Sequence, residues 1–140
     1  MGRRILAVLA GIVTAFVIVA LIEGLGYLLF PPPEGMDPMD PESVRAMMDQ
    51  ISPMSMLMVA IAWACAAFGG AFVAGKIGGP PSLIPALIIG GFLVIASIVN
   101  LIMIPSPIWF WIVGLLPPLP LAILGGRTGA GKTGRTPEVL

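Results

Sequence analysis

The sequence predicts an all-α integral membrane four-helix bundle. One reason is length: four apolar stretches each approach the ~20 residues that a helix needs to cross the ~30 Å hydrocarbon core of a bilayer. Composition is the other, since 58% of the 140 residues are hydrophobic and only 10% are charged, against ~25% charged in soluble domains. The expected spans are residues 5–30, 54–75, 83–104 and 108–124. They use most of the chain, so we expect a single membrane domain over residues 1–140.

Charged residues predict how the spans are oriented. The basic residues beside the spans are Arg3, Arg4, Lys76, Arg127, Lys132 and Arg135. The loop at 31–52 holds five acidic residues and only one basic residue, Arg45. Because basic residues flank the cytoplasmic ends of spans, we expect both termini and the link around Lys76 in the cytoplasm. The acidic loop should then lie outside, and residues 125–140 should form a flexible cytoplasmic tail.

The first span could be mistaken for a secretory signal, because it follows Met-Gly-Arg-Arg directly. Signal cores run to ~7–15 apolar residues and end at a small-residue cleavage site. Here the apolar run continues to Phe30 and ends in three prolines at 31–33. Proline lacks a backbone N–H and restricts the residue before it. We therefore expect a retained transmembrane helix that stops at the proline triplet.

Within the outer loop, residues 40–51 predict a short amphipathic helix. Asp40 is suited to the N-cap and Pro41 to the first helical position. Apolar residues at helical spacing then follow, namely Val44, Met47, Met48 and Ile51. Such a helix is expected on the outer membrane surface, with its methionine face toward lipid or the bundle. Ser52-Pro53 and Ser106-Pro107 repeat the cap-and-proline pattern at the starts of spans two and four.

Small residues recur every four positions along the second span. The stripe consists of Ala62, Ala66, Gly70 and Ala74. Small side chains let helix backbones approach closely in a membrane, where lipid gives helices no hydrophobic reason to associate. The stripe is either the seam of a homo-oligomer or the contact with spans one and three of the same chain. A four-helix monomer must bury some face of span two, which favours the contact within one chain.

Glu23 is the only charged residue inside the four spans. A charge within the membrane costs ~2.5–3.5 kcal/mol on insertion scales, and it is a functional-site hypothesis by default. At ~1.5 Å per residue, Glu23 should lie ~10 Å below the outer end of its helix. Tyr27 follows one turn later on the same face. Asn100 and Ser97 should lie at a similar depth in span three.

These four polar residues have two interpretations. In the first, they form a ligand or proton site in an outward-facing polar pocket centred on Glu23. In the second, Glu23 is a structural carboxyl group that reaches toward the interface or stays protonated, with a hydrogen bond to Asn100 or Tyr27. The sequence leaves both open.

Three prolines interrupt the fourth span close to the middle of the bilayer. Pro117, Pro118 and Pro120 follow about ten residues after the start of that span. Prolines remove backbone donors and break the hydrogen-bond ladder of a helix. Broken helices at this depth are typical of many transporter sites, and a kink that shapes a small bundle is the alternative.

Other patterns exclude classes of chemistry. Residues 126–133 match G-x-x-x-x-G-K-[ST], but that pattern binds phosphate only between a buried strand and a helix. Here a transmembrane span precedes Gly126, and Pro137 lies in the short segment after Thr133, so we expect neither nucleotide nor nucleic acid as a partner.

The chain has no His and one Cys, Cys65. We therefore expect no metal site, no cofactor and no catalytic residue.

Two stretches resemble a family of small, uncharacterised four-helix membrane proteins of bacteria. They are Glu-Gly-Leu-Gly-Tyr-Leu-Leu-Phe-Pro-Pro-Pro at 23–33 and Met-Ile-Pro-Ser-Pro-Ile-Trp-Phe-Trp at 103–111. The resemblance extends over all four spans and implies no activity. In size, span count and a first-span glutamate, the chain is also similar in architecture to the small multidrug resistance transporters. The acidic outer loop and the proline triplet are unlike that second family.

The leading expectation is a small protein of the bacterial inner membrane that binds or transports a small or lipidic molecule around Glu23. The alternative is a structural or accessory subunit that acts through helix packing. An enzyme is not expected, because only Glu23 and Tyr27 could serve as an acid or base. The expected partner is the lipid bilayer, and a homo-oligomer through span two is left open.

The charge distribution makes a topological prediction. Reporter fusions at Lys76 and after Leu140 should report the cytoplasm, whereas a fusion at Asp40 should report the outer side of the membrane. Enzymatic reporters that are active on only one side of the membrane provide the measurement. A cytoplasmic signal at Asp40 would contradict the orientation of every span.

Overall fold

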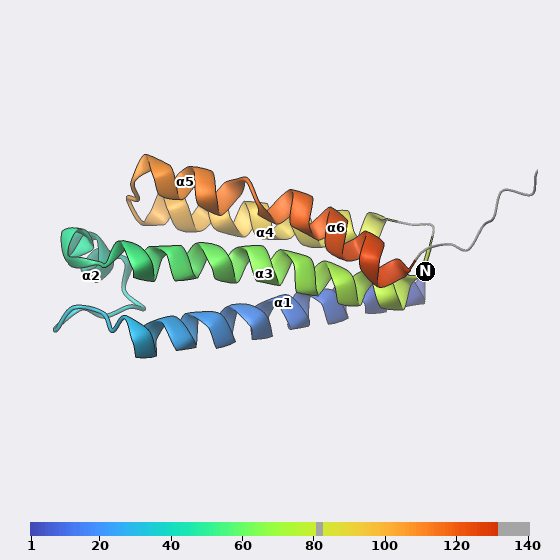
Figure 1. Ribbon diagram of the computed structural model, residues 1–140, viewed down its shortest axis with the longest axis horizontal. Helices are drawn as coiled ribbons and strands as arrows, with labels where there is room; N and C mark the ends of the chain where they lie inside the picture. Colours follow the sequence, from blue (N-terminus) through green and yellow to red (C-terminus); the bar gives the residue numbers. More distant parts are fainter. Residues whose placement is uncertain (81–82, 132–140) are drawn as a thin grey trace, which may run out of the picture.

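Four long helical segments make up most of the molecule (Figure 1). The computed structural model describes residues 1–80 and 83–131, and the regular structure within these ranges is entirely helical. The elements are α1 (Gly2–Leu29), α2 (Pro41–Ala46), η1 (Met48–Gln50), α3 (Pro53–Gly78), α4 (Ile84–Met103), α5 (Ile108–Leu115) and α6 (Pro118–Ala130). In these ranges α1, α3, α4 and the combined segment Ile108–Ala130 are long and apolar enough to cross a membrane. The prediction of an all-helical chain with four candidate spans is confirmed.

The helix α3 lies at the centre of the bundle. It packs mainly against α1 on one side and α6 on the other, while α4 packs against both α3 and α6. Figure 1 shows α2 at the end of the bundle opposite the N-terminus, and α6 ending at the same end of the bundle as the N-terminus. The outer loop therefore lies at one end, and the start of α1 and the end of α6 lie at the other.

Two of the three predicted helix caps are present. The Asp40 carboxylate accepts a hydrogen bond from the Glu42 N–H at 3.1 Å, and the Ser52 hydroxyl accepts one from the Met54 N–H at 3.3 Å. The cap at Ser106 is wrong, because Pro107 is extended and α5 begins only at Ile108. Ser106 is thus one residue too early to cap the helix, and its hydroxyl donates to the Ile104 carbonyl at 3.0 Å instead.

The helix expected over residues 40–51 is interrupted. It ends at Ala46 and is followed by the short turn η1. Val44 is buried, and Met48 and Ile51 are half-buried, so the apolar face contacts the bundle. The Arg45 side chain donates a hydrogen bond from Nε to the Met103 carbonyl at 2.6 Å, which ties α2 to the end of α4. A helix this short is marginal alone, so tertiary contacts decide where it ends.

The small-residue stripe of span two faces α1 and α4 within the same chain. Ala62, Ala66, Gly70 and Ala74 are all buried. A Cβ atom added to Gly70 would lie 2.7 Å from the Gly11 carbonyl oxygen and 3.3 Å from Ile89. The contact within one chain therefore occupies the stripe in the described residues. A homo-oligomer through span two stays a prediction, and it would need another face of α3.

A second set of small residues joins α3 to α6. Cβ atoms added to Gly125 and Gly129 would collide with the backbone carbonyls of Phe68 and Phe72, and one added to Gly75 would collide with Gly126. The fourth span was expected to end at 124 and give way to a tail, but α6 continues to Ala130. The glycines after residue 124 explain this difference, because they let α6 pack directly on the α3 backbone.

The same helix bears on the phosphate-loop pattern at 126–133. Its first five residues, 126–130, belong to α6. Backbone N–H groups inside a helix already bond to carbonyls four residues earlier, so they are not free to surround a phosphate. Lys132 and Thr133 lie outside the described residues. The exclusion of nucleotide stays a prediction, and close helix packing accounts for the glycines.

The proline interruption in the fourth span is present as predicted. Helix α5 ends at Leu115 and α6 begins at Pro118. Leu116 and Pro117 keep helical dihedral angles, with φ −70° and ψ −45° at Leu116. The span therefore bends without losing its direction, as Figure 1 shows between α5 and α6.

Close packing at Gly70 can be tested with a minimal change. Gly70→Ala should destabilise the protein by about 1–3 kcal/mol, the usual cost of overpacking, because the new methyl group meets the Gly11 carbonyl. Gly91→Ala is the matched control, since its added Cβ would find nothing within 4 Å and alanine favours helix over glycine. Thermal unfolding in detergent measures both. Equal melting temperatures for the two variants would contradict the close contact.

Candidate functional site

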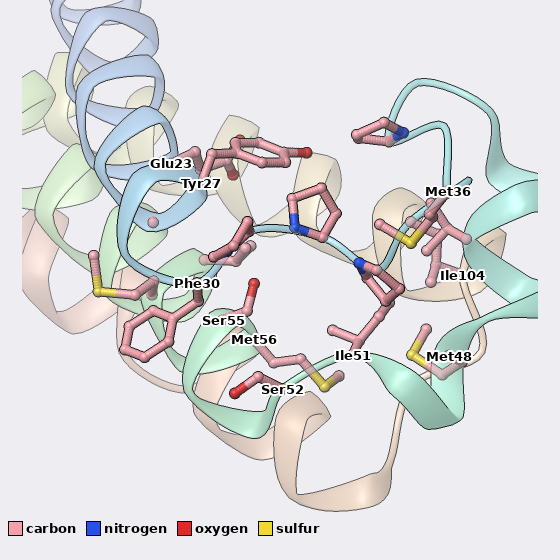
Figure 2. Close-up of a pocket in the computed structure, with 18 of the residues that line it drawn as sticks. Glu23, Tyr27, Phe30, Met36, Met48, Ile51, Ser52, Ser55, Met56 and Ile104 are labelled. Atoms are coloured by element: carbon pink, nitrogen blue, oxygen red, sulfur yellow. The ribbon is translucent and has the colours of Figure 1, made fainter.

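A cavity of about 220 Å³ lies under the outer loop, between the ends of α1, α3, α4 and α5 (Figure 2). We call it the outer cavity. Its wall consists of Glu23, Gly26, Tyr27, Phe30, Pro31, Pro32, Pro33, Met36, Pro38, Val44, Met48, Ile51, Ser52, Ser55, Met56, Met58, Val59, Asn100, Ile104, Ser106 and Phe110. Glu23 is the one charged side chain of that wall.

The last two turns of α1 provide one side of the outer cavity. Glu23, Gly26, Tyr27 and Phe30 recur at the three- and four-residue spacing that places residues on one helix face. Figure 2 shows Glu23 and Tyr27 beside each other on this face. Gly26 is buried, and an added Cβ there would lie 3.3 Å from Met58. The absence of a side chain at Gly26 thus lets α1 approach α3 beneath the cavity.

Residues of the outer loop form the side of the cavity at the end of the bundle where α2 lies. The proline triplet at 31–33 lines the cavity. Met36, Met48 and Ile51 line it too, and Figure 2 shows their side chains around it. Methionine side chains are flexible and adapt to irregular shapes. The methionines and prolines of the cover are therefore apolar and deformable, whereas the polar groups Glu23, Ser55 and Asn100 come from α1, α3 and α4.

A second cavity of about 260 Å³ lies between α1 and α4, on the surface of α3. We call it the interhelical cavity. Its wall consists of Ala15, Phe16, Val19, Glu23, Trp63, Phe92, Leu93, Ala96, Ser97 and Asn100. The rings of Phe16 and Phe92 meet edge to face with centroids 6.0 Å apart, and they bridge α1 and α4 at the far end from Glu23. Glu23 and Asn100 line both cavities.

Glu23 has no compensating charge nearby. It is half-buried, and none of the described residues that line either cavity is a lysine or arginine. Within residues 1–80 and 83–131, no hydrogen bond joins the Glu23 carboxyl group to Tyr27 or Asn100. The hydrogen bond required by one version of the structural interpretation is therefore not formed in this structure. The carboxyl group faces the cavities instead.

The structure brings together the four residues that the sequence suggested as a site. Glu23, Tyr27 and Asn100 line the outer cavity, and Ser97 lines the interhelical cavity between Glu23 and the aromatic pair. Their role as a ligand site stays a prediction. In the described ranges, no three His, Cys, Asp or Glu residues come close enough to hold a metal ion.

Sequence reasoning did not identify the remainder of the wall. Phe16 and Phe92 are ordinary apolar residues in apolar helices, so nothing in the sequence distinguishes them. The ring centroid of Trp63 lies 5.7 Å from that of Phe110, and Trp63 also lines the interhelical cavity. The apolar face of residues 40–51 was the available signal that the outer loop covers a site.

Comparison with known proteins returned no matching family model, curated protein or solved structure. The resemblance to small four-helix bacterial membrane proteins therefore stays a prediction carried by the stretches at 23–33 and 103–111. The inference of function depends on the two cavities and their lining.

Access of water to the outer cavity can be measured directly. In a Cys65→Ser background, Ser55→Cys places one thiol in the cavity wall, and an impermeant maleimide added to intact cells should label it from outside. Ala20→Cys is the control: Ala20 is exposed on α1 but lines neither cavity, and a thiol facing lipid does not form the reactive thiolate. Labelling of Ser55→Cys only after the cells are opened would contradict an outward-facing cavity.

Proposed function

We propose that this protein binds a small or lipidic molecule at the outer side of the membrane, with Glu23 as the central polar contact. The observation that carries the proposal is the position of Glu23 at the junction of the outer and interhelical cavities. Each cavity falls short of the roughly 300–1,000 Å³ of a typical ligand pocket, while the two together reach that range. A few polar groups within an apolar wall are also the usual composition of such sites.

The orientation belongs to the same proposal. Basic residues lie near the end of the bundle where α1 begins, and acidic residues lie in the loop at the other end. By the positive-inside rule, the outer cavity then opens away from the cytoplasm of a bacterial cell, with the protein in the inner membrane. A molecule that arrives from the outer leaflet or the outer aqueous phase would reach Glu23 first.

A carboxyl group at the junction of two cavities suits a binder or a transporter more than a purely structural subunit. A subunit that acts only through helix packing would not need an unpaired carboxyl group at a cavity wall. Intramembrane charges are costly and normally face a cavity or a partner. A role in ligand binding would therefore account for a carboxyl group at this position, whereas helix packing alone would not.

A ligand screen with a matched variant tests the proposal. Purified protein in lipid nanodiscs is heated with panels of lipids, cations and drug-like amphiphiles, and unfolding is followed by fluorescence. A ligand at one hundred times its Kd should stabilise the wild type by about 2.7 kcal/mol. Glu23→Gln keeps the shape of the side chain but not its charge, so it should melt normally alone and lose the ligand-induced shift.

The ligand screen has a control variant and a result that would contradict the proposal. Glu42→Gln removes a charge from the exposed face of α2, outside both cavity walls, and should respond to ligand as the wild type does. If no compound shifts the wild type, or if Glu23→Gln responds equally, the proposed function is wrong. A structural subunit would then be the better account.

A further inference from the structure

We propose that the ligand is an amphiphile with a positively charged amine head at Glu23 and a short hydrocarbon tail in the interhelical cavity. This inference rests on the proposed function and names its ligand class. It follows from the division of the site into two chambers of different character. Glu23 and Asn100 form the boundary that both chambers share.

The lining of the interhelical cavity suits a hydrocarbon tail. Apart from the boundary residues and Ser97, its lining is hydrocarbon or aromatic. It extends along α1 from Glu23 to Phe16, seven residues or about 10 Å at ~1.5 Å per residue. One leaflet of the hydrocarbon core is about 15 Å deep, half of the whole core. The contact between Phe16 and Phe92 therefore limits the tail to less than the length of one leaflet.

The lining of the outer cavity suits a positively charged head group. Glu23 is its one charged residue, and Ser55 and Asn100 add hydrogen-bonding groups. Tyr27 and Phe30 line the same wall, and aromatic ring faces attract cations electrostatically. A half-buried carboxylate gains more from an ammonium group than a fully exposed one does, because the effective dielectric constant around it is lower. Charge complementarity therefore selects an amine.

The same lining disfavours a phospholipid head. A phosphate placed beside Glu23 would meet like charge, and no lysine or arginine among the described wall residues could balance it. Arg45, the one basic residue of the loop at 31–52, does not line either cavity and donates its Nε–H to the Met103 carbonyl. A single amine without phosphate fits the wall, and an anionic amphiphile does not.

Tryptophan quenching tests the head and the tail separately. Trp109→Phe and Trp111→Phe leave Trp63, in the interhelical wall, as the one tryptophan of the three. This parent protein in nanodiscs is titrated with decylamine carrying bromine near its terminal carbon, and with the matching brominated decanol and decanoic acid. The amine should quench Trp63 fluorescence with at least tenfold lower apparent Kd than the alcohol or the acid. Unbrominated decylamine should restore the signal.

Two variants, each with its own expectation, locate the ligand. Glu23→Gln should raise the apparent Kd of the amine at least tenfold, to that of the alcohol. Ala96→Phe should fill the interhelical cavity and abolish quenching, while Ala20→Phe on the exposed side of α1 should behave as the parent does. Competition by unbrominated decylamine reports tail binding without any substitution, so a folding defect in Ala96→Phe leaves that part of the test intact.

The contrary outcomes distinguish the inference from the proposed function. Equal quenching by amine and alcohol, unchanged in Glu23→Gln, overturns the amine head. Quenching that survives both Ala96→Phe and excess unbrominated decylamine overturns the tail site, because it then reflects probe dissolved in lipid. In either case a Glu23-dependent ligand in the thermal screen keeps the proposed function. If that screen also finds none, the proposed function fails as well.

Discussion

The structure depends on how closely other helices approach the backbone of α3. Gly70 of α3 meets Gly11 of α1 on one side, and on the other Gly125 and Gly129 of α6 lie against the Phe68 and Phe72 carbonyls. Lipid offers helices no hydrophobic gain from association, so dense contact between small residues has to hold the bundle. A side chain at any of these positions would push a helix away from the centre.

The cavities are a consequence of where that dense contact is placed. The small residues of α3 draw α1 and α6 inward, whereas α1 and α4 touch each other less and meet through the rings of Phe16 and Phe92. Large rings hold two helices apart as well as together, which leaves space on the α3 surface between Phe16 and Glu23. The candidate site therefore lies along a loosely packed seam between α1 and α4, which the proposed ligand could enter without displacing the core.

The outer loop covers the end of this seam that holds Glu23. Its apolar residues rest on the cavity, and the bond from Arg45 to the Met103 carbonyl fastens α2 to the end of α4. The ring of Phe110 on α5 lines the outer cavity, and its centroid lies 5.7 Å from that of Trp63 on α3, which lines the interhelical cavity. A head group at Glu23 would thus lie between a rigid helical floor and a deformable cover rich in methionine and proline.

The sequence by itself determined the four apolar helices, the proline break and the caps at Asp40 and Ser52, because length, missing donors and side-chain acceptors act locally. It also drew attention to Glu23, because a charge in an apolar helix is conspicuous without any fold. Only the tertiary structure decided that α6 runs on to Ala130, since its glycines look like a flexible tail until the α3 backbone lies against them. Only the tertiary structure placed Glu23 and Asn100 at the junction of two cavities, with Phe16, Phe92 and Trp63 around one of them. Residues distant in the chain form those walls, and no local pattern records which helix faces meet.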